Sequence, residues 1–146
     1  MNTLELKTIL KNDPWAWNTK VCAIDELPSN VITYPAAFIV NTDERDEPGE
    51  HWLAIYLTCP QKAEFFDSYG HAPCYFNNKL CHFLSSYDIQ YNTRPFQGPL
   101  SAVCGHYCVL FILHRARGVS FSNILNILDS VDSDSFAQDV LNKRHI

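Results

Sequence analysis

The hydrophobic pattern divides the chain into a strand-rich first part and a helical last part. Residues 3–11 place four apolar side chains close to helical spacing, and the Asn-Asp-Pro sequence that follows ends the predicted helix. Residues 15–28 are rich in aromatic and turn-forming residues, and we expect them to form an irregular loop packed on the core. The run Ala-Ala-Phe-Ile-Val-Asn at 36–41 predicts a buried strand, and the charged segment 43–50 predicts a loop.

Residues 51–58 are expected to form a strand at the centre of a sheet. Side chains alternate between the two faces of a strand, and after His51 both sets are apolar for most of this segment. Residues 63–67 predict a second strand, which pairs with the first as a β-hairpin. Helical spacing at 76–84 and alternation at 87–91 then predict a short helix and a further strand.

The last third of the chain changes to helical periodicity. The breaker-rich loop 97–101 leads into residues 102–117, whose apolar side chains form a helical stripe, and Gly118 supplies the expected C-terminal cap. Two further amphipathic segments follow at 121–128 and 136–141. Strands mixed with segregated helices predict the α+β fold class.

Length and composition indicate one domain that spans residues 1–146. The chain is 47% hydrophobic, which is enough to bury a core at this length. Its formal net charge of -5 argues against a nucleic-acid backbone as the main partner. No apolar run approaches the roughly 20 residues that span a bilayer, and the first residues lack the features of a secretory signal. We therefore expect an intracellular protein with no membrane partner.

Six cysteines raise the alternatives of disulfides, a metal site and a reactive thiol. An intracellular setting favours free thiols over disulfides, and we expect one of the thiols to be reactive. No Cys-x-x-Cys pair occurs, although Cys81 and His82 are adjacent and Cys104 precedes Cys108 by one helical turn. The sequence thus predicts neither a bound metal nor a cofactor.

Cys104 is the candidate nucleophile, because it lies in the first turn of the most apolar predicted helix. A thiol at that position faces unpaired backbone N–H groups and the positive end of the helix dipole, which lower its pKa. The alternative is a small buried side chain, and spacing alone does not decide between the two. Cys108 lies one turn further along among apolar residues and is the better candidate for that inert role.

A thiolate nucleophile needs an imidazole base, and the imidazole needs an orienting group behind it. His51, at the start of the predicted central strand, is the best placed of the six histidines, although a structural role is an open alternative. Asp67 falls on the same face as His51 if the hairpin turn holds three or five residues, or if a bulge corrects an even turn. The alternative for Asp67 is a turn residue that makes local hydrogen bonds.

Acyl transfer also needs hydrogen-bond donors for the oxyanion that develops in the transition state. The backbone N–H of Cys104 is one candidate donor. The side-chain amide of Gln97, in the loop before the helix, is a second. Taken alone, Gln97 would be an ordinary polar loop residue.

This ordered set of residues resembles the adenain family, the adenovirus-type cysteine endopeptidases with relatives in other DNA viruses and virus-like transposons. It is more distantly similar to the Ulp1-type proteases that remove SUMO. The matching stretches are AFIVNT at 37–42, GEHW at 49–52, FFDS at 65–68 and QGPLSAVCG at 97–105. The resemblance implies a single-domain cysteine protease with a mixed central β-sheet and the nucleophile at the N-terminus of a central helix.

By position, the catalytic residues of the family correspond to four residues of this chain. The resemblance implies that His51 is the base, Asp67 the acid, Gln97 the oxyanion donor and Cys104 the nucleophile. It does not imply a metal.

The resemblance also implies three substrate-binding residues, Trp52, Gly49 and Gly105. Trp52 matches an aromatic residue that narrows the cleft in such enzymes, a geometry that favours glycine next to the scissile bond. The implied substrate is therefore a polypeptide that is cut after a Gly-containing motif.

Three functions follow as hypotheses from the resemblance. The first is a viral maturation protease that trims capsid or core precursors, located in the host nucleus or the virion. The second is a deconjugating enzyme for a ubiquitin-like modifier, since the acid is Asp rather than Glu. The third is a non-catalytic binding module with the same fold. Thiol alkylation kinetics distinguish the third from the other two.

Two features depart from the adenovirus enzymes, which are activated by DNA and by a disulfide-linked viral peptide. The stretch in which those enzymes carry the linking cysteine reads Ser85-Ser86-Tyr87 in this chain. The acidic balance of the chain also differs from their basic character. We therefore expect neither a covalent peptide activator nor activation by DNA.

Overall fold

The computed structural model describes residues 1–49, 51–98, 103–130 and 133–144. In chain order the elements are α1 (Thr3–Lys11), β1 (Lys20–Ala23), η1 (Ile24–Glu26), β2 (Ala36–Asn41), β3 (Trp52–Cys59), β4 (Lys62–Phe66), η2 (Pro73–Tyr75), α2 (Asn78–Phe83), β5 (Asp88–Tyr91), α3 (Cys104–Ala116), α4 (Phe121–Asp129) and α5 (Ser133–Arg144). Within those residues, no helix combines the length and the apolar character that crossing a bilayer requires.

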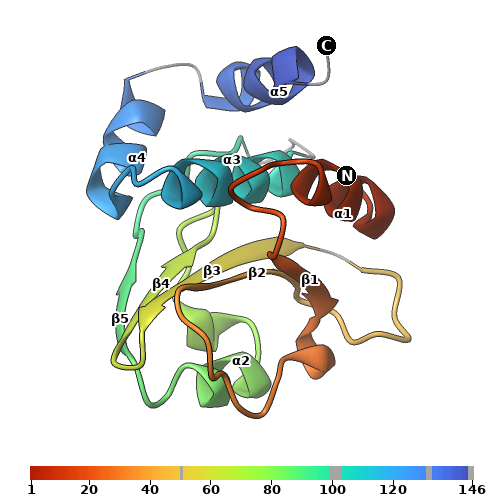
Figure 1. Cartoon of the computed structure of the whole chain (residues 1–146), viewed down its shortest axis with the longest axis vertical. Coiled ribbons are helices and arrows are strands. Elements are labelled where there is room, and N and C mark those ends of the chain that lie inside the picture. Colours follow the sequence, from red (N-terminus) through yellow and green to blue (C-terminus); the bar gives the residue numbers. More distant parts are fainter. Residues whose placement is uncertain (50, 99–102, 131–132, 145–146) are drawn as a thin grey trace.

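One mixed sheet of five strands, in the order β1-β2-β3-β4-β5, forms the middle of the molecule (Figure 1). The inner pairs β2·β3 and β3·β4 are antiparallel, and the outer pairs β1·β2 and β4·β5 are parallel. β3 is the central strand, as predicted, because apolar side chains on both of its faces are buried.

Helices cover both faces of the sheet and give three layers (Figure 1). α3 and α1 lie on one face, over a core that includes Ile39, Ala54 and Phe66. α2 lies on the other face, over a core that includes Leu53 and Phe65. α5 packs on the outside of α3. The alternation of core residues along the strands confirms the predicted α+β class and the two buried faces.

The prediction of a loop over residues 15–28 was wrong for its second half, which contains β1 and the short helix η1. β1 has only four residues, too few for a periodic signal. It pairs in parallel with β2, with Val21 opposite Ile39, so its partner in space decides its conformation. The predicted helix at 76–84 is shorter, at Asn78–Phe83, and follows η2.

The prediction that all six cysteines are free was also wrong. Cys74, in η2, and Cys81, in α2, form a disulfide with their Cα atoms 4.9 Å apart. The two short helices turn the chain back on itself and bring these residues together, which a composition argument does not capture. The described free cysteines are Cys22, Cys59, Cys104 and Cys108.

The β3–β4 hairpin has an even turn that a bulge corrects. Cys59 pairs with Lys62 around a two-residue turn, and the register shifts by one residue between Leu57 and Cys59. Beyond the bulge Ala54 pairs with Phe66, so Asp67 continues the ladder on the face that His51 shares. The bulge is one of the two solutions that the sequence allowed for bringing this acid and base together.

α3 begins at Cys104 and ends at Ala116, within the predicted range 102–117. Residue 102 and the loop residues 99–101 lie outside the described residues. Gly118 follows with a positive φ of 86°, so it closes the helix in the conformation that only glycine adopts at low cost.

Candidate active site

Three elements converge at one end of the sheet and carry the predicted base, acid and nucleophile. His51 immediately precedes β3, Asp67 immediately follows β4, and Cys104 is the first residue of α3. The hairpin brings the first two side chains together, and the packing of α3 along β3 brings the thiol to the same place.

His51 and Asp67 form the central contact of the site. His51 Nε2 lies 2.6 Å from Asp67 Oδ1, with the Asp67 side chain fully buried and the His51 side chain 12% exposed. Because Nε2 is engaged with the carboxylate, Nδ1 is the ring nitrogen that remains for Cys104. The ring is held between Tyr69 and Phe76, whose ring centroids lie 5.1 Å and 5.7 Å from its own.

Asp67 is fixed by its own backbone as well as by its carboxylate. Asn92 accepts a hydrogen bond from the Asp67 backbone N–H at 3.1 Å and donates one to its carbonyl at 2.6 Å. The backbone N–H groups of Tyr69 and His71 donate to the carboxylate at 3.2 Å and 2.9 Å. Burial raises the pKa of Asp67, but its hydrogen bonds to His51 and these N–H groups outweigh it and lower the pKa below 3.8. The acid is therefore ionised at neutral pH.

A second imidazole, which the sequence did not suggest, also contacts Asp67. His71 Nδ1 lies 3.1 Å from Asp67 Oδ2, and the His71 ring stacks on Tyr75 at 4.0 Å. The turn that returns His71 to the acid needs Gly70, which has a φ of +79° and would place a Cβ 2.7 Å from the Arg94 backbone. The spacing Asp-x-x-Gly-His after a predicted strand end was the available signal.

Cys104 lies where several groups stabilise its thiolate. Burial raises the pKa of the thiol, but a hydrogen bond with His51, backbone hydrogen bonds from Trp52 and Gly105, and the charge of His51 lower it below 9.0 overall. By contrast, Cys108 is completely buried one turn later, and burial holds its pKa well above 9.0. The two cysteines thus have the reactive and inert environments that their positions suggested.

His51 is the positive partner of this pair. Burial of its ring lowers the pKa, yet hydrogen bonds to Asp67 and Cys104 and the negative charge on both raise it to about 9. The imidazolium form of His51 and the thiolate form of Cys104 therefore stabilise each other.

Gln97 is buried next to the same site, in the segment before α3. Its Oε1 accepts a hydrogen bond of 2.5 Å from the Ser68 hydroxyl, and its backbone N–H donates to the Ser68 carbonyl at 3.1 Å. The next residue, Gly98, donates its N–H to Asp134 at 3.2 Å, and Tyr107 contacts the same carboxylate at 2.5 Å. Contacts to Ser68, after the end of β4, and to Asp134 in α5 thus fix the segment that carries the predicted oxyanion donor.

Two of the three predicted substrate-binding residues, Trp52 and Gly105, lie next to the nucleophile. Trp52 and the exposed Gly49 line a groove of about 940 Å³ that continues along Met1 and the start of β1. The indole of Trp52 donates to the Met1 carbonyl at 3.0 Å. Gly105 is buried, and a Cβ there would lie 2.9 Å from the Met1 side chain. Gly105 allows close packing and offers its N–H to the thiol.

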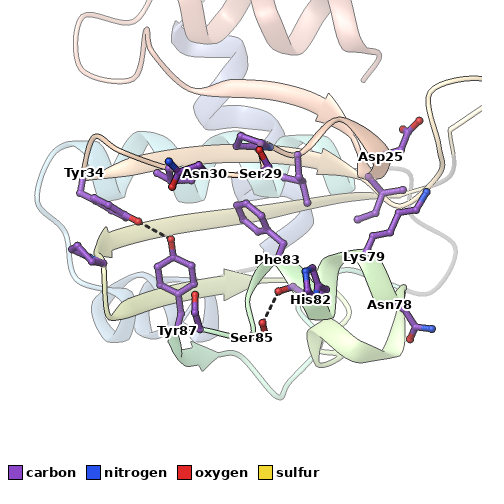
Figure 2. A pocket seen from close by; sticks show the side chains of 16 residues that line it. Asp25, Ser29, Asn30, Tyr34, Asn78, Lys79, His82, Phe83, Ser85 and Tyr87 are labelled. Atoms are coloured by element: carbon purple, nitrogen blue, oxygen red, sulfur yellow. Dashed lines mark hydrogen bonds between the residues drawn. The ribbon is translucent and has the colours of Figure 1, made fainter.

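A second hollow, of about 760 Å³, lies on the opposite side of the sheet, between η1, the chain before β2, and α2 (Figure 2). The hydroxyls of Tyr34 and Tyr87 meet across it at 2.7 Å. None of the residues that line it belongs to the site around Cys104. Among the described residues, no group of three or more His, Cys, Asp or Glu side chains has an arrangement that could hold a metal ion.

Comparisons with known proteins point to viral proteases. No protein-family model matches the chain. The "Protease" of Porcine adenovirus A serotype 3 is 27% identical over 66% of this chain and 56% of that protein. The "Putative thiol protease R355" of Acanthamoeba polyphaga mimivirus is 33% identical over 70% of this chain and 36% of that protein.

Solved structures share the fold. A crystal structure of the ASFV pS273R protease matches with a TM-score of 0.53 and 16% identity, over 83% of this chain and 59% of that one. A selenomethionine form of the same protease gives a TM-score of 0.51 and 17% identity. The chain is thus related to the adenain-like viral cysteine proteases. This chain spans only 56% and 36% of the two sequence relatives, so the activities of those whole proteins do not transfer to it automatically.

Proposed function

We propose that the chain is a cysteine endopeptidase that cuts polypeptides after Gly-containing motifs. The observation that carries this proposal is the contact of one imidazole, His51, with both a buried ionised carboxylate and a thiol at a helix N-terminus. Acyl transfer requires a nucleophile, a base in contact with the nucleophile, and an acid that orients the base. The viral relatives named as proteases support it.

In the proposed mechanism the Cys104 thiolate attacks the scissile carbonyl carbon, and the carbonyl oxygen becomes an oxyanion. The Cys104 backbone N–H and the Gln97 side-chain amide stabilise that charge. The tetrahedral intermediate collapses, the C–N bond breaks, and the His51 imidazolium gives its proton to the leaving amine. A water molecule then loses a proton to His51, attacks the thioester and releases the acid, which restores the thiolate and the imidazolium.

The substrate proposal rests on Trp52, which follows His51 in the chain and whose indole would lie 3.4 Å from a Cβ at Gly105, the residue after Cys104. Trp52 and Gly49 also line a groove of about 940 Å³, which is large enough for an extended peptide. We favour viral capsid or core precursors as substrates, within the host nucleus or the virion. Conjugates of a ubiquitin-like modifier are the alternative that Asp67 favours.

The two substrate classes can be separated directly. The purified protein is incubated with peptides that contain an internal Gly-Gly or Gly-X-Gly motif and with folded modifiers that end in Gly-Gly fused to a reporter. Cleavage of the peptides after glycine supports the endopeptidase, whereas turnover confined to the fusions assigns the deconjugating function. Cleavage of neither, together with a Cys104 thiol that iodoacetamide modifies no faster than free cysteine at pH 7, contradicts both and leaves the non-catalytic module.

The pH dependence of kcat/KM is expected to be bell-shaped. The acid limb reflects formation of the Cys104 thiolate, whose pKa lies below 9.0, and the alkaline limb reflects loss of the His51 proton at about 9. Activity is therefore highest between the two, where the thiolate and imidazolium coexist. Initial rates at subsaturating peptide from pH 5 to pH 10 test this. A rate that keeps rising through pH 10 would show that the imidazolium is not needed.

A further inference from the structure

Ser68 lies between the acid and the oxyanion donor and contacts the donor directly. It follows Asp67 in the chain, its side chain is fully buried, and its hydroxyl donates a hydrogen bond of 2.5 Å to Gln97 Oε1. Its carbonyl accepts from the N–H groups of Phe96 and Gln97 at 2.8 Å and 3.1 Å. The backbone and the side chain of one residue thus hold Gln97.

The orientation of a glutamine amide depends on the groups that form hydrogen bonds with it. The oxygen and nitrogen ends have almost the same shape, so sterics alone do not decide which end faces the reacting carbonyl. In the structure the Ser68 hydroxyl donates to Oε1, so the oxygen end of the amide lies against Ser68 and the N–H₂ end faces away from it. The reversed amide would present an oxygen lone pair to the oxyanion and repel it.

We propose that Ser68 is a positioning residue that sets the orientation of the Gln97 amide, so that its N–H₂ group is the end presented to the oxyanion. This inference rests on the proposed function of the site and on Gln97 as an oxyanion donor. Ser68 does not contact the substrate carbonyl. Asp67 and Ser68 are adjacent and directly follow β4. This short segment therefore positions both residues: Asp67 orients the base His51, and Ser68 orients the donor Gln97.

The test compares two reactions of Cys104. Cleavage of a Gly-Gly peptide passes through an oxyanion, whereas alkylation by iodoacetamide displaces iodide at a tetrahedral carbon and forms none. Ser68→Ala is expected to lower kcat by about tenfold or more, while KM and the alkylation rate at each pH stay within about twofold of wild type. A loss of activity through Asp67 and His51 would instead slow alkylation and shift its pH profile.

A double-mutant cycle supplies the second readout. If Ser68 acts through Gln97, then adding Ser68→Ala to Gln97→Ala changes kcat by less than about twofold, although each single substitution lowers it. Independent effects that multiply in the double variant would overturn the proposal, as would an unchanged kcat in Ser68→Ala. Wild-type protein that cleaves no peptide would contradict the proposed function rather than this inference.

Two further variants control for stability. Ser120→Ala removes another serine hydroxyl, which accepts from the Asn123 N–H at 3.1 Å and caps α4, so it lowers the melting temperature without changing kcat. Ser68→Cys keeps the shape of the side chain, with a slightly larger atom that donates a weaker hydrogen bond, and its kcat is expected to lie between those of Ser68→Ala and wild type. It replaces Ser68→Ala if that variant does not fold. A Ser68→Cys protein with wild-type kcat would contradict the proposed role of the hydroxyl.

Discussion

Replacing Cys104 by alanine is expected to reduce peptide cleavage by about 10⁴-fold or more, because no other group of the site can form the thioester. Cys108 cannot substitute for it, since that thiol is fully buried and its pKa is raised. The fold should persist, because the change removes one partly exposed sulfur and should cost no more than about 1 kcal/mol of unfolding free energy. Single-turnover cleavage of a Gly-Gly peptide and thermal unfolding measure the two effects.

The same variant makes a second, independent prediction about His51. Its pKa of about 9 depends in part on the hydrogen bond and the negative charge of Cys104, so both are lost with the sulfur. The pKa of His51 in Cys104→Ala is therefore expected to lie below 9, as measured by NMR titration of the ring. A matched control is Cys59→Ala, which removes a free thiol at the end of β3 that lies away from His51 and should leave cleavage intact. Substantial cleavage by Cys104→Ala would end the proposed mechanism.

Replacing Asp67 by asparagine is expected to lower kcat by about 10³–10⁴-fold, a loss second only to that of the nucleophile. The Asp67 carboxylate contacts His51, His71 and two backbone N–H groups. Asparagine has nearly the same shape, but its amide carries no charge and has only one acceptor oxygen for these partners. The imidazolium loses its stabilising charge and its fixed orientation. The pKa of His51 should fall, and the alkaline limb of the pH profile should move to lower pH.

Stability is expected to respond to Asp67 in a defined pH range. The pKa of Asp67 is lowered in the folded state, so its ionised form contributes stability above the ordinary pKa of 3.8, and that contribution is lost as the pH falls through the lower folded-state value. The loss in Asp67→Asn should therefore be larger at pH 7 than at pH 2. Asp129→Asn is the control, since Asp129 pairs with Arg94 at the surface. It should cost less than about 1 kcal/mol and leave kcat unchanged. Asp67→Asn with wild-type kcat would exclude an orienting role.

The sequence by itself determined the central strand and the place of the nucleophile. Both faces of β3 are apolar, so no other position in a sheet could bury them, and the burial of Leu53 and Ala54 follows. Likewise, a breaker-rich loop before the most apolar helical stripe leaves few positions for the start of α3, and Cys104 is at that start. These features depend on residues that are close together in the chain, so the hydrophobic periodicity of a short segment is enough to predict them.

Tertiary structure alone decided the contacts between distant segments. The sequence left open whether a turn length or a bulge would place Asp67 beside His51, and strand pairing selected the bulge at Leu57 to Cys59. Pairing with β2 likewise made a strand of the predicted loop at β1.

The sequence analysis predicted neither the contact of His71 with Asp67 nor that of Ser68 with Gln97, and it did not predict the Cys74–Cys81 disulfide. A single turn or bulge changes which side chains face each other, and its small free-energy differences depend on the packing of the whole sheet. Local patterns therefore specified which groups could react, and three-dimensional packing specified which of them meet.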